Sequence, residues 1–366
     1  MKDDTKLVHL GRHPERHFGA VNTPPFRAST ILHPTLEVYE KAAQPFVYGR
    51  RGTPTTRYLE EAIAALEGGD RTVLTPSGLS ACTIAILAFT SAGDHILVTD
   101  GCYGPTRNFC TTTLKRFGVE TEFYGPCIGG GIAGLMRENT RLVFCESPSS
   151  LTFEVQDVPA IAAAAHARGA LVLADNTWAT PLLFRPFEKG IDVSIHAATK
   201  YLAGHADANV GTITVKEPHA QALVQTHGNL GQCASADEAY LMTRGLRTLS
   251  VRLARSAETG LRLAQFLKSR PEVERILHPA LEGDPGHSLW KRDFLGTSGL
   301  FGFELKPCSE AARQAFFDGL ELFGLGASWG GYESLIVPAH PKRNEGAAHA
   351  AGPLVRISAG LEDPDD

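Results

Sequence analysis

The stretch that runs from RLVFCE (141–146) to ALVLAD (170–175) decides the fold. Its two outer segments are short runs of apolar residues, which is typical of strands that are buried on both faces. Between them lies DVPAIAAAAHARG (157–169), which has the marks of a helix. Asp157 suits the N-cap and Gly169 suits the end. This order of strand, helix and strand predicts two parallel strands with a helix packed against them.

The same alternation extends along most of the chain. Further strands are predicted at four segments, HILVTD (95–100), TEFYG (121–125), DVSIHA (192–197) and GTITV (211–215). Helical patterns lie between them, so we expect an α/β domain with a mostly parallel sheet covered on both sides. After about residue 236 the pattern changes to long helices and then to short strands, which predicts a second, smaller α+β domain. The expected divisions are a loop-like arm at 1–45, a large domain at 46–245 and a C-terminal domain at 246–366.

Composition excludes several classes of protein. The chain has 366 residues, 43% of them hydrophobic and 20% charged, with a net charge of −5. This balance is that of a globular protein and does not indicate a nucleic-acid-binding face. No apolar run is long enough for a membrane helix, and the first residues lack the apolar core of a secretory signal. Seven scattered cysteines predict reduced thiols in a cytoplasm and argue against a zinc site.

Residues whose side chains can bind ligands or take part in catalysis follow the predicted strands. In an open α/β sheet, ligands bind beyond the carboxyl ends of the strands. ALVLAD ends in Asp175, and SIHAATK ends in Lys200. The turn Ser77–Gly78–Leu79 precedes an apolar helix, so its backbone N–H groups offer a phosphate site. Tyr103 follows another strand on a glycine-flanked loop.

These four parts are what pyridoxal 5′-phosphate requires. A helix N-terminus holds its phosphate, an aromatic ring stacks on its face, an aspartate pairs with its ring nitrogen, and a lysine forms a Schiff base. Taken singly, each part has an ordinary explanation, since Asp175 could cap a helix and Lys200 could be a solvated charge. The conjunction of the four predicts the cofactor.

Long motifs support this prediction. They are VYGRRGTPTTRYLEEAIAALEGG (47–69), SGLSA (77–81), CYGPT (102–106), CESPSSLTFEVQDVPAI (145–161), ADNTWATP (174–181), SIHAATKYLAGHADANVGT (194–212), AYLMTRGLRTL (239–249), GHSLWKRDFLGTSGLFGFEL (286–305) and SWGGYESLI (328–336). Together they resemble the Cys/Met-metabolism enzymes, which are pyridoxal-phosphate proteins with the aspartate aminotransferase fold (fold type I). Within that family they are most similar to the bacterial cystathionine β-lyase branch.

The resemblance implies roles in holding the cofactor. Lys200 would form the Schiff base and shuttle a proton, Asp175 would pair with the ring nitrogen, and Tyr103 would stack on the ring. The phosphate would be held by the turn at 77–79, through the amides of Gly78 and Leu79 beside Ser77, and by the hydroxyl of Thr199.

The resemblance also implies a substrate site and an assembly. Arg356 would clamp the substrate α-carboxylate, with Ser328 and Trp329 lining the same pocket. Tyr48 and Arg50 would reach the phosphate of a neighbouring subunit, which implies a homodimer and, for the family, a tetramer of two dimers. Tyr103 and Tyr48 are the candidates for assisting proton transfer from the incoming amine.

The implied reaction is β-elimination from cystathionine or related thioether amino acids, giving a thiol, pyruvate and ammonia. The alternative is γ-elimination or γ-replacement on the same scaffold. A bulky residue at Trp329 favours the β-lyases, although the indole could also serve only in core packing.

The chain departs from the family pattern at three places. Ala197 stands where many members have serine, the segment before Arg356 (338–356) is short, and the chain ends at LEDPDD, where relatives continue into a closing helix. We therefore expect a C-terminal domain without that helix and a phosphate site that depends more on the turn at 77–79.

Two weaker sequence patterns suggest other functions. GGGIAG (129–134) matches a dinucleotide-binding fingerprint and would indicate a nicotinamide dehydrogenase, but a loop is the favoured interpretation. His9, His13 and His17 are spaced by four residues, but Pro14 interrupts any helix, so we interpret them as surface residues and expect no metal site. His196 and His205 are expected to pack or to bond to nearby backbone. A non-catalytic scaffold is the third alternative.

Overall fold

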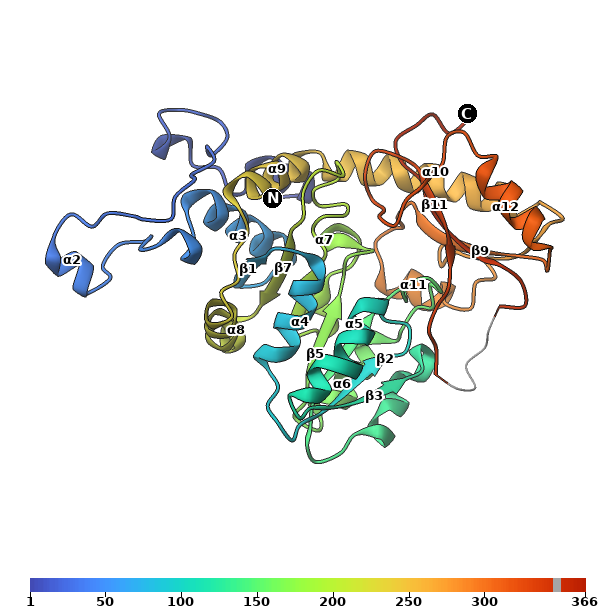
Figure 1. The fold of residues 1–366 in the computed structure, drawn as a ribbon, viewed down its shortest axis with the longest axis horizontal. Coiled ribbons are helices and arrows are strands. Elements are labelled where there is room, and N and C mark those ends of the chain that lie inside the picture. The colour runs from blue at the N-terminus through green and yellow to red at the C-terminus, as the bar shows by residue number, and fades with distance from the viewer. Residues whose placement is uncertain (345–349) are drawn as a thin grey trace.

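The computed structural model describes residues 1–344 and 350–366, and it contains two β-sheets (Figure 1). Residues 345–349, which belong to the segment expected to be short, lie outside the described residues. The strands are β1 (Arg71–Thr75), β2 (His95–Thr99), β3 (Glu120–Tyr124), β4 (Thr140–Glu146), β5 (Leu171–Asp175), β6 (Val193–His196), β7 (Gly211–Val215), β8 (Val273–Leu277), β9 (Leu300–Leu305), β10 (Gly324–Leu325), β11 (Leu335–Ala339) and β12 (Leu354–Ser358). The helices are α1 (Asp3–His9), α2 (Leu36–Glu40), α3 (Pro54–Glu67), α4 (Gly78–Ala88), α5 (Gly104–Phe109), α6 (Val158–His166), α7 (Thr180–Leu183), α8 (Glu217–Asn229), α9 (Ala236–Arg247), α10 (Leu249–Lys268), α11 (His287–Asp293) and α12 (Glu310–Asp318).

The first sheet confirms the predicted parallel arrangement. Among the described residues its strand order is β1-β7-β6-β5-β4-β2-β3, and β7 is the strand that runs antiparallel to its neighbours. Each strand predicted from the sequence is present within one residue of its expected bounds. The register pairs Glu146 with Asp175 and Asp175 with Ile195, so the carboxyl ends of β4, β5 and β6 lie side by side.

Helices cover both faces of this sheet because alternate residues of its strands point in opposite directions. Val143 and Val172 face the core that contains α6, whereas Phe144 and Leu173 face the core that contains α4. Helix α6 begins as predicted, since Asp157 Oδ1 accepts the Ala160 N–H over 3.2 Å. The four side chains from the strands are fully buried, and burial of this kind supplies most of the stabilisation of the sheet.

The second sheet has the order β10-β11-β12-β9-β8 and is mainly antiparallel. Its core contains Phe301, Val355 and Ile357 and packs against α10. The helical region expected after residue 236 is divided into α9 and α10, which meet at Thr248. In Figure 1, α10 passes from the first sheet to the second.

The N-terminal region differs from expectation. Residues 3–9 form helix α1 rather than loop, and Leu7 on this helix is buried in the core that contains α3. His17 is also buried, with its ring 5.9 Å from that of Tyr58, so the prediction that it lies on the surface is wrong. Beyond it, the segment that carries α2 extends away from the rest of the chain (Figure 1).

No helix in the described part of the chain has both the length and the apolar character needed to cross a bilayer.

Candidate active site

Lys200 and Asp175 lie at neighbouring strand ends of the first sheet. Asp175 is the last residue of β5, and its neighbour β6 ends at His196. The chain then turns back, because the Lys200 N–H donates to the Ala197 carbonyl over 3.0 Å. The sheet therefore holds the carboxylate, and the turn after the next strand holds the amine.

The Lys200 amine is enclosed by residues of the C-terminal part of the chain. Its Nζ donates to Ser328 Oγ over 2.8 Å and lies 5.5 Å from the centre of the Trp329 ring. Burial and, to a smaller extent, the positive charge of Arg356 lower the pKa of Lys200 to about 8, while Asp175 opposes them. The neutral amine is therefore accessible near physiological pH, as a nucleophile or base requires.

The Asp175 carboxylate is buried and held on both oxygens. Oδ1 accepts the Thr177 N–H over 3.0 Å and also the Thr177 hydroxyl, and Oδ2 faces Cys82 Sγ at 3.7 Å. Burial raises the pKa of Asp175, although the hydrogen bonds from Thr177 act in the opposite direction. A buried carboxylate of this kind is suited to pair with a cationic ring nitrogen.

The turn at 77–79 forms the N-terminus of α4. Ser77 Oγ caps the helix by accepting the Ser80 N–H over 3.1 Å, while Gly78 and Leu79 belong to the first turn, whose N–H groups have no partner within a helix. A Cβ at Gly78 would lie 2.3 Å from Ala197 Cβ, so the turn and the start of the lysine loop are in close contact. The hydroxyl of Thr199 already exchanges hydrogen bonds with the backbone of Val210, at 3.0 and 3.3 Å.

Tyr103 and Arg356 lie near the two strand-end residues, close enough to shift their ionisation or to be shifted by them. Tyr103 is 44% exposed, and burial followed by the nearby charges of Cys82, Glu146 and Asp175 raises its pKa, while Arg356 acts in the opposite direction. Arg356 comes from β12, and its Nη2 donates to the carbonyls of Ala327 and Ser328, each over 3.0 Å. Asp175 and Arg356 therefore both act on the ionisation of Lys200 and of Tyr103.

Comparison with known proteins decides the family. Residues 4–366 match the family described as "Cys/Met metabolism PLP-dependent enzyme". The chain belongs to this family. A protein of Rhizobium johnstonii named "Putative cystathionine beta-lyase" is 51% identical over 99% of this chain and 93% of its own length. Cystathionine beta-lyase MetC of Escherichia coli is 44% identical over 100% of this chain and 96% of its own length.

A solved structure gives the fold. The crystal structure of metB from Corynebacterium glutamicum superposes with a TM-score of 0.93 at 30% identity, covering 100% of this chain and 95% of that chain. The expected α/β architecture of fold type I pyridoxal-phosphate enzymes is thereby confirmed. As a member of the Cys/Met-metabolism family, the chain uses pyridoxal 5′-phosphate.

The residues present fit that cofactor. They include a lysine with a lowered pKa, a buried carboxylate and the first turn of α4, where Gly78 lets the backbone approach Ala197 more closely than a Cβ would permit. A phosphate is stabilised at such a helix N-terminus by free N–H groups and by the helix dipole.

Two predicted site residues make their described contacts with other parts of the chain than Lys200 and Asp175. Arg50 Nη1 donates to the Gly228 carbonyl over 3.1 Å, and Tyr48 is 45% exposed. Within residues 1–344 and 350–366, neither side chain has a hydrogen bond or ion pair to Lys200 or Asp175. Their expected role at the phosphate of another subunit stays a prediction.

Two contacts of Tyr103 and Asp175 were not anticipated from the sequence. Glu146, at the end of β4, accepts the Tyr103 N–H over 2.7 Å, and Cys82 lies against Asp175. The strand-end position of Glu146 is visible in the sequence, as it is for Asp175. Cys82 has no such signal, because nothing in a helical sequence specifies which face meets a carboxylate.

The weaker motifs have structural roles. The glycine run 129–134 lies within a 3₁₀ segment, Pro126–Leu135, and does not form the strand–turn–helix unit that dinucleotide binding requires. His205 bonds to the Ala203 carbonyl as expected, over 2.7 Å, and His196 is packed in the interior as expected, where it pairs with the buried Glu67 side chain.

Proposed function

We propose that this protein is a carbon–sulfur lyase that cleaves cystathionine and related S-substituted cysteines by β-elimination. The observation that carries the proposal is the position of the Lys200 amine, with its lowered pKa, between Ser328, Trp329 and Arg356. The assignment of the substrate draws on the full-length similarity to cystathionine beta-lyase MetC of Escherichia coli.

Pyridoxal 5′-phosphate, when bound, supplies a ring that stabilises negative charge at the substrate Cα. Asp175 would hold the proton on the ring nitrogen, and the turn at 77–79 would hold the phosphate. Tyr103 would cover one face of the ring. To donate to the phosphate, the Thr199 hydroxyl would have to give up its hydrogen bond to the Val210 carbonyl.

Arg356 would orient the substrate through its α-carboxylate, since a guanidinium binds a carboxylate with two parallel hydrogen bonds. The neutral Lys200 amine would then remove the Cα proton. The Cβ–S bond breaks, its electron pair leaves with sulfur, and water completes the reaction to pyruvate and ammonia. With cystathionine the released thiol is homocysteine.

Trp329 is the residue proposed to favour β- over γ-elimination. Its ring faces the Lys200 amine and also packs 5.5 Å from the ring of Tyr201, so it reduces the space beside the base. A smaller residue there would leave room for a leaving group on Cγ, one carbon further from the substrate Cα than in β-elimination.

The decisive experiment is to incubate the cofactor-loaded protein with L-cystathionine and to identify the keto acid. Pyruvate supports β-elimination, whereas 2-oxobutyrate overturns it in favour of a γ-lyase. Lys200→Ala provides the control for uncatalysed breakdown. Trp329→Ala should raise the ratio of 2-oxobutyrate to pyruvate, and an unchanged ratio would assign the indole to packing alone.

A homo-oligomer is part of the proposal, as a dimer or a dimer of dimers. Large apolar side chains of the N-terminal segment are exposed, including Phe18, Leu32 and Leu36, and the described contacts of Arg50 are with Gly228 and with the Tyr48 ring. A second copy that receives this segment would bury the apolar groups and complete the phosphate site.

Mixed dimers test this arrangement. Lys200→Ala and Arg50→Ala chains, each with its own affinity tag, should be poorly active separately. If Arg50 serves the partner, a mixed dimer contains one site in which both residues are native, and activity returns. No recovery in purified mixed dimers would place Arg50 in its own subunit's chemistry or outside the site.

The proposed compartment is the cytoplasm. All seven cysteines are free thiols, and Cys127, Cys233 and Cys308 are exposed, a condition that a reducing compartment maintains.

A further inference from the structure

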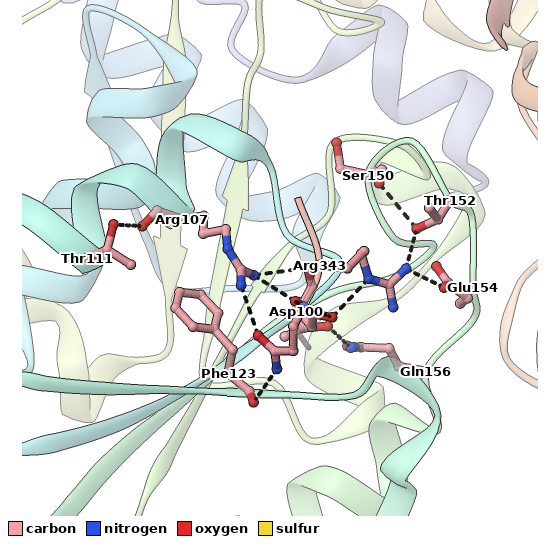
Figure 2. A network of polar contacts seen from close by, with 11 residues as sticks. Asp100, Arg107, Thr111, Phe123, Ser150, Thr152, Glu154, Gln156 and Arg343 are labelled. Carbon is pink, nitrogen blue, oxygen red and sulfur yellow. Dashed lines mark hydrogen bonds and ion pairs between the residues drawn. The ribbon is translucent and has the colours of Figure 1, made fainter. Parts of the chain in front are cut away.

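A buried carboxylate stands at the base of the loop that carries Tyr103. Asp100 directly follows β2, and its side chain is 2% exposed. It accepts hydrogen bonds from Arg107 Nη1 over 2.7 Å and from Arg343 Nε over 2.9 Å (Figure 2). The backbone N–H of Asn344 adds two further contacts, at 3.0 and 3.1 Å. The carboxylate is therefore saturated with donors, two of which come from a segment more than 240 residues away in the sequence.

Arg343 joins Asp100 to a second loop of the large sheet. Its Nη1 donates to Glu154 Oε1 over 2.7 Å and to Thr152 Oγ1 over 3.2 Å (Figure 2). The side chains of Arg343 and Asp100 are 8% and 2% exposed, so their ion pair is largely removed from water, whereas the Glu154 side chain is 30% exposed. Removing one partner of a buried ion pair is strongly destabilising, because it leaves the other charge buried and unpaired.

Arg343 and Asn344 belong to the connection between β11 and β12 of the second sheet. The same connection leads into Arg356, the residue proposed to bind the substrate carboxylate. Strand β11, which Arg343 follows, pairs with β12 and places Val337 opposite Arg356, so the contacts at Asp100 fasten the second sheet to the large sheet at the base of the Tyr103 loop. Arg107 reinforces this attachment, because its Nη2 donates to Asn344 Oδ1 over 2.9 Å.

The loop between Asp100 and Tyr103 has little freedom. Gly101 is pressed against Ser149, since a Cβ there would lie 2.3 Å from Ser149 Oγ. The Gly101 carbonyl accepts the Ser150 N–H over 2.8 Å, and the Tyr103 N–H donates to Glu146 over 2.7 Å. With Asp100 fixed at one end and Tyr103 at the other, a displacement of Asp100 would be transmitted to the tyrosine ring.

We infer that Arg343 is a positioning residue that holds the Tyr103 loop through Asp100 and aligns it with the β12 strand that carries Arg356. This inference rests on the proposed role of Tyr103 in covering the cofactor ring. It predicts that the ion pair sets cofactor affinity and turnover, besides stabilising the fold.

The test uses three variants of the full chain loaded with pyridoxal 5′-phosphate. Arg343→Met removes the charge, and Arg343→Lys keeps one charge but cannot make the same set of bonds to Asp100, Thr152 and Glu154. Arg141→Met is the matched control, because Arg141 pairs over 3.2 Å with Asp94, which precedes the same strand β2, and its side chain is 53% exposed. The readouts are the cofactor dissociation constant by fluorescence titration, kcat and KM for cystathionine, and thermal unfolding.

Arg343→Met should weaken cofactor binding and lower kcat, each by about 10-fold or more, whereas Arg141→Met should leave both within about 2-fold of the native protein. Arg343→Lys should give intermediate values. A loss of thermal stability in Arg343→Met with unchanged cofactor affinity, kcat and KM would overturn the inference and leave a purely structural ion pair.

A double-mutant cycle with Tyr103→Ala separates this inference from the proposed function. If Arg343 acts through the tyrosine, then Arg343→Met in a Tyr103→Ala background should change the cofactor dissociation constant by less than about 2-fold. Full additivity overturns the inference. If Tyr103→Ala alone has no effect on the cofactor, the proposed role of Tyr103 is what fails. Should Arg343→Met not fold, Arg343→Lys completes the same cycle.

Discussion

The Lys200 amine donates to the Ser328 hydroxyl over 2.8 Å, although the two residues are 128 positions apart in the sequence. The neighbouring Ser328 carbonyl accepts from Arg356. The segment around Ser328, which precedes β11, therefore contacts both the proposed base, Lys200, and the proposed carboxylate-binding residue, Arg356. The positive charge of Arg356 is one reason why the pKa of Lys200 falls to about 8.

The first prediction concerns the pH dependence of stability in the cofactor-free protein. The pKa of Lys200 is about 8 in the folded chain, and in the unfolded chain it has the ordinary lysine value of 10.5. Between these pH values the unfolded chain therefore binds more protons than the folded chain. The contribution of this residue to the free energy of unfolding should therefore rise with pH from about 8 to about 10.5. Below pH 8 it should be about 3 kcal/mol lower than above pH 10.5. Lys200→Met should remove this rise and stabilise the protein at pH 7. Denaturant unfolding at several pH values provides the measurement, and a native-like slope in the variant would contradict it.

Gly78→Ala should impair the phosphate turn. The new Cβ would lie 2.3 Å from Ala197 Cβ and 2.7 Å from Ala197 Cα, so the backbone at one of the two sites must move. We expect about 10-fold weaker cofactor binding and a loss of about 1–3 kcal/mol in the free energy of unfolding. Gly134→Ala is the control, because its Cβ would meet no atom within 4 Å. Equal effects of the two changes on cofactor affinity would exclude a special role for the turn.

Ala197→Ser should strengthen cofactor binding. Ala197 lies against Gly78, so a serine hydroxyl there would stand beside the N-terminus of α4 and could donate to the phosphate. One added hydrogen bond to a charged group predicts an affinity gain of about 5-fold or more. Ala167→Ser, at the exposed end of α6, should have no effect. Fluorescence titration with the cofactor compares the variants, and unchanged affinity in Ala197→Ser would mean that the hydroxyl does not reach the phosphate.

Arg356→Lys should raise KM for cystathionine more than it lowers kcat. A lysine cannot make two parallel hydrogen bonds to a carboxylate while also holding the carbonyls of Ala327 and Ser328, as the Arg356 guanidinium does. Loss of one charge-assisted bond corresponds to about a 10- to 100-fold rise in KM. The control is Arg255→Lys on the outer face of α10, where the side chain is 38% exposed. A change confined to kcat would point to a role in proton transfer rather than in carboxylate binding.

Much of the fold follows from local patterns. Buried strands are apolar at successive positions, so β2 to β7 were located within one residue, and strand ends indicated Asp175, Lys200 and Tyr103. The apolar helix after Ser77 likewise indicated the phosphate turn. Local patterns failed at residues 3–9, where the short helix α1 is stabilised by packing on α3, and at His17, which is buried against an aromatic ring. Neither contact has a periodic signal.

The sequence by itself determined which residues end the strands, because hydrophobic periodicity and turn residues act over a few positions. Only the tertiary structure decided which distant groups meet there. Arg343 reaches Asp100, Ser328 reaches Lys200 and Cys82 reaches Asp175 because the two sheets and helix α4 pack in one particular way. Such contacts depend on the three-dimensional arrangement of elements far apart in the chain, and the lowered pKa of Lys200 is a consequence of that arrangement rather than of its neighbours in sequence.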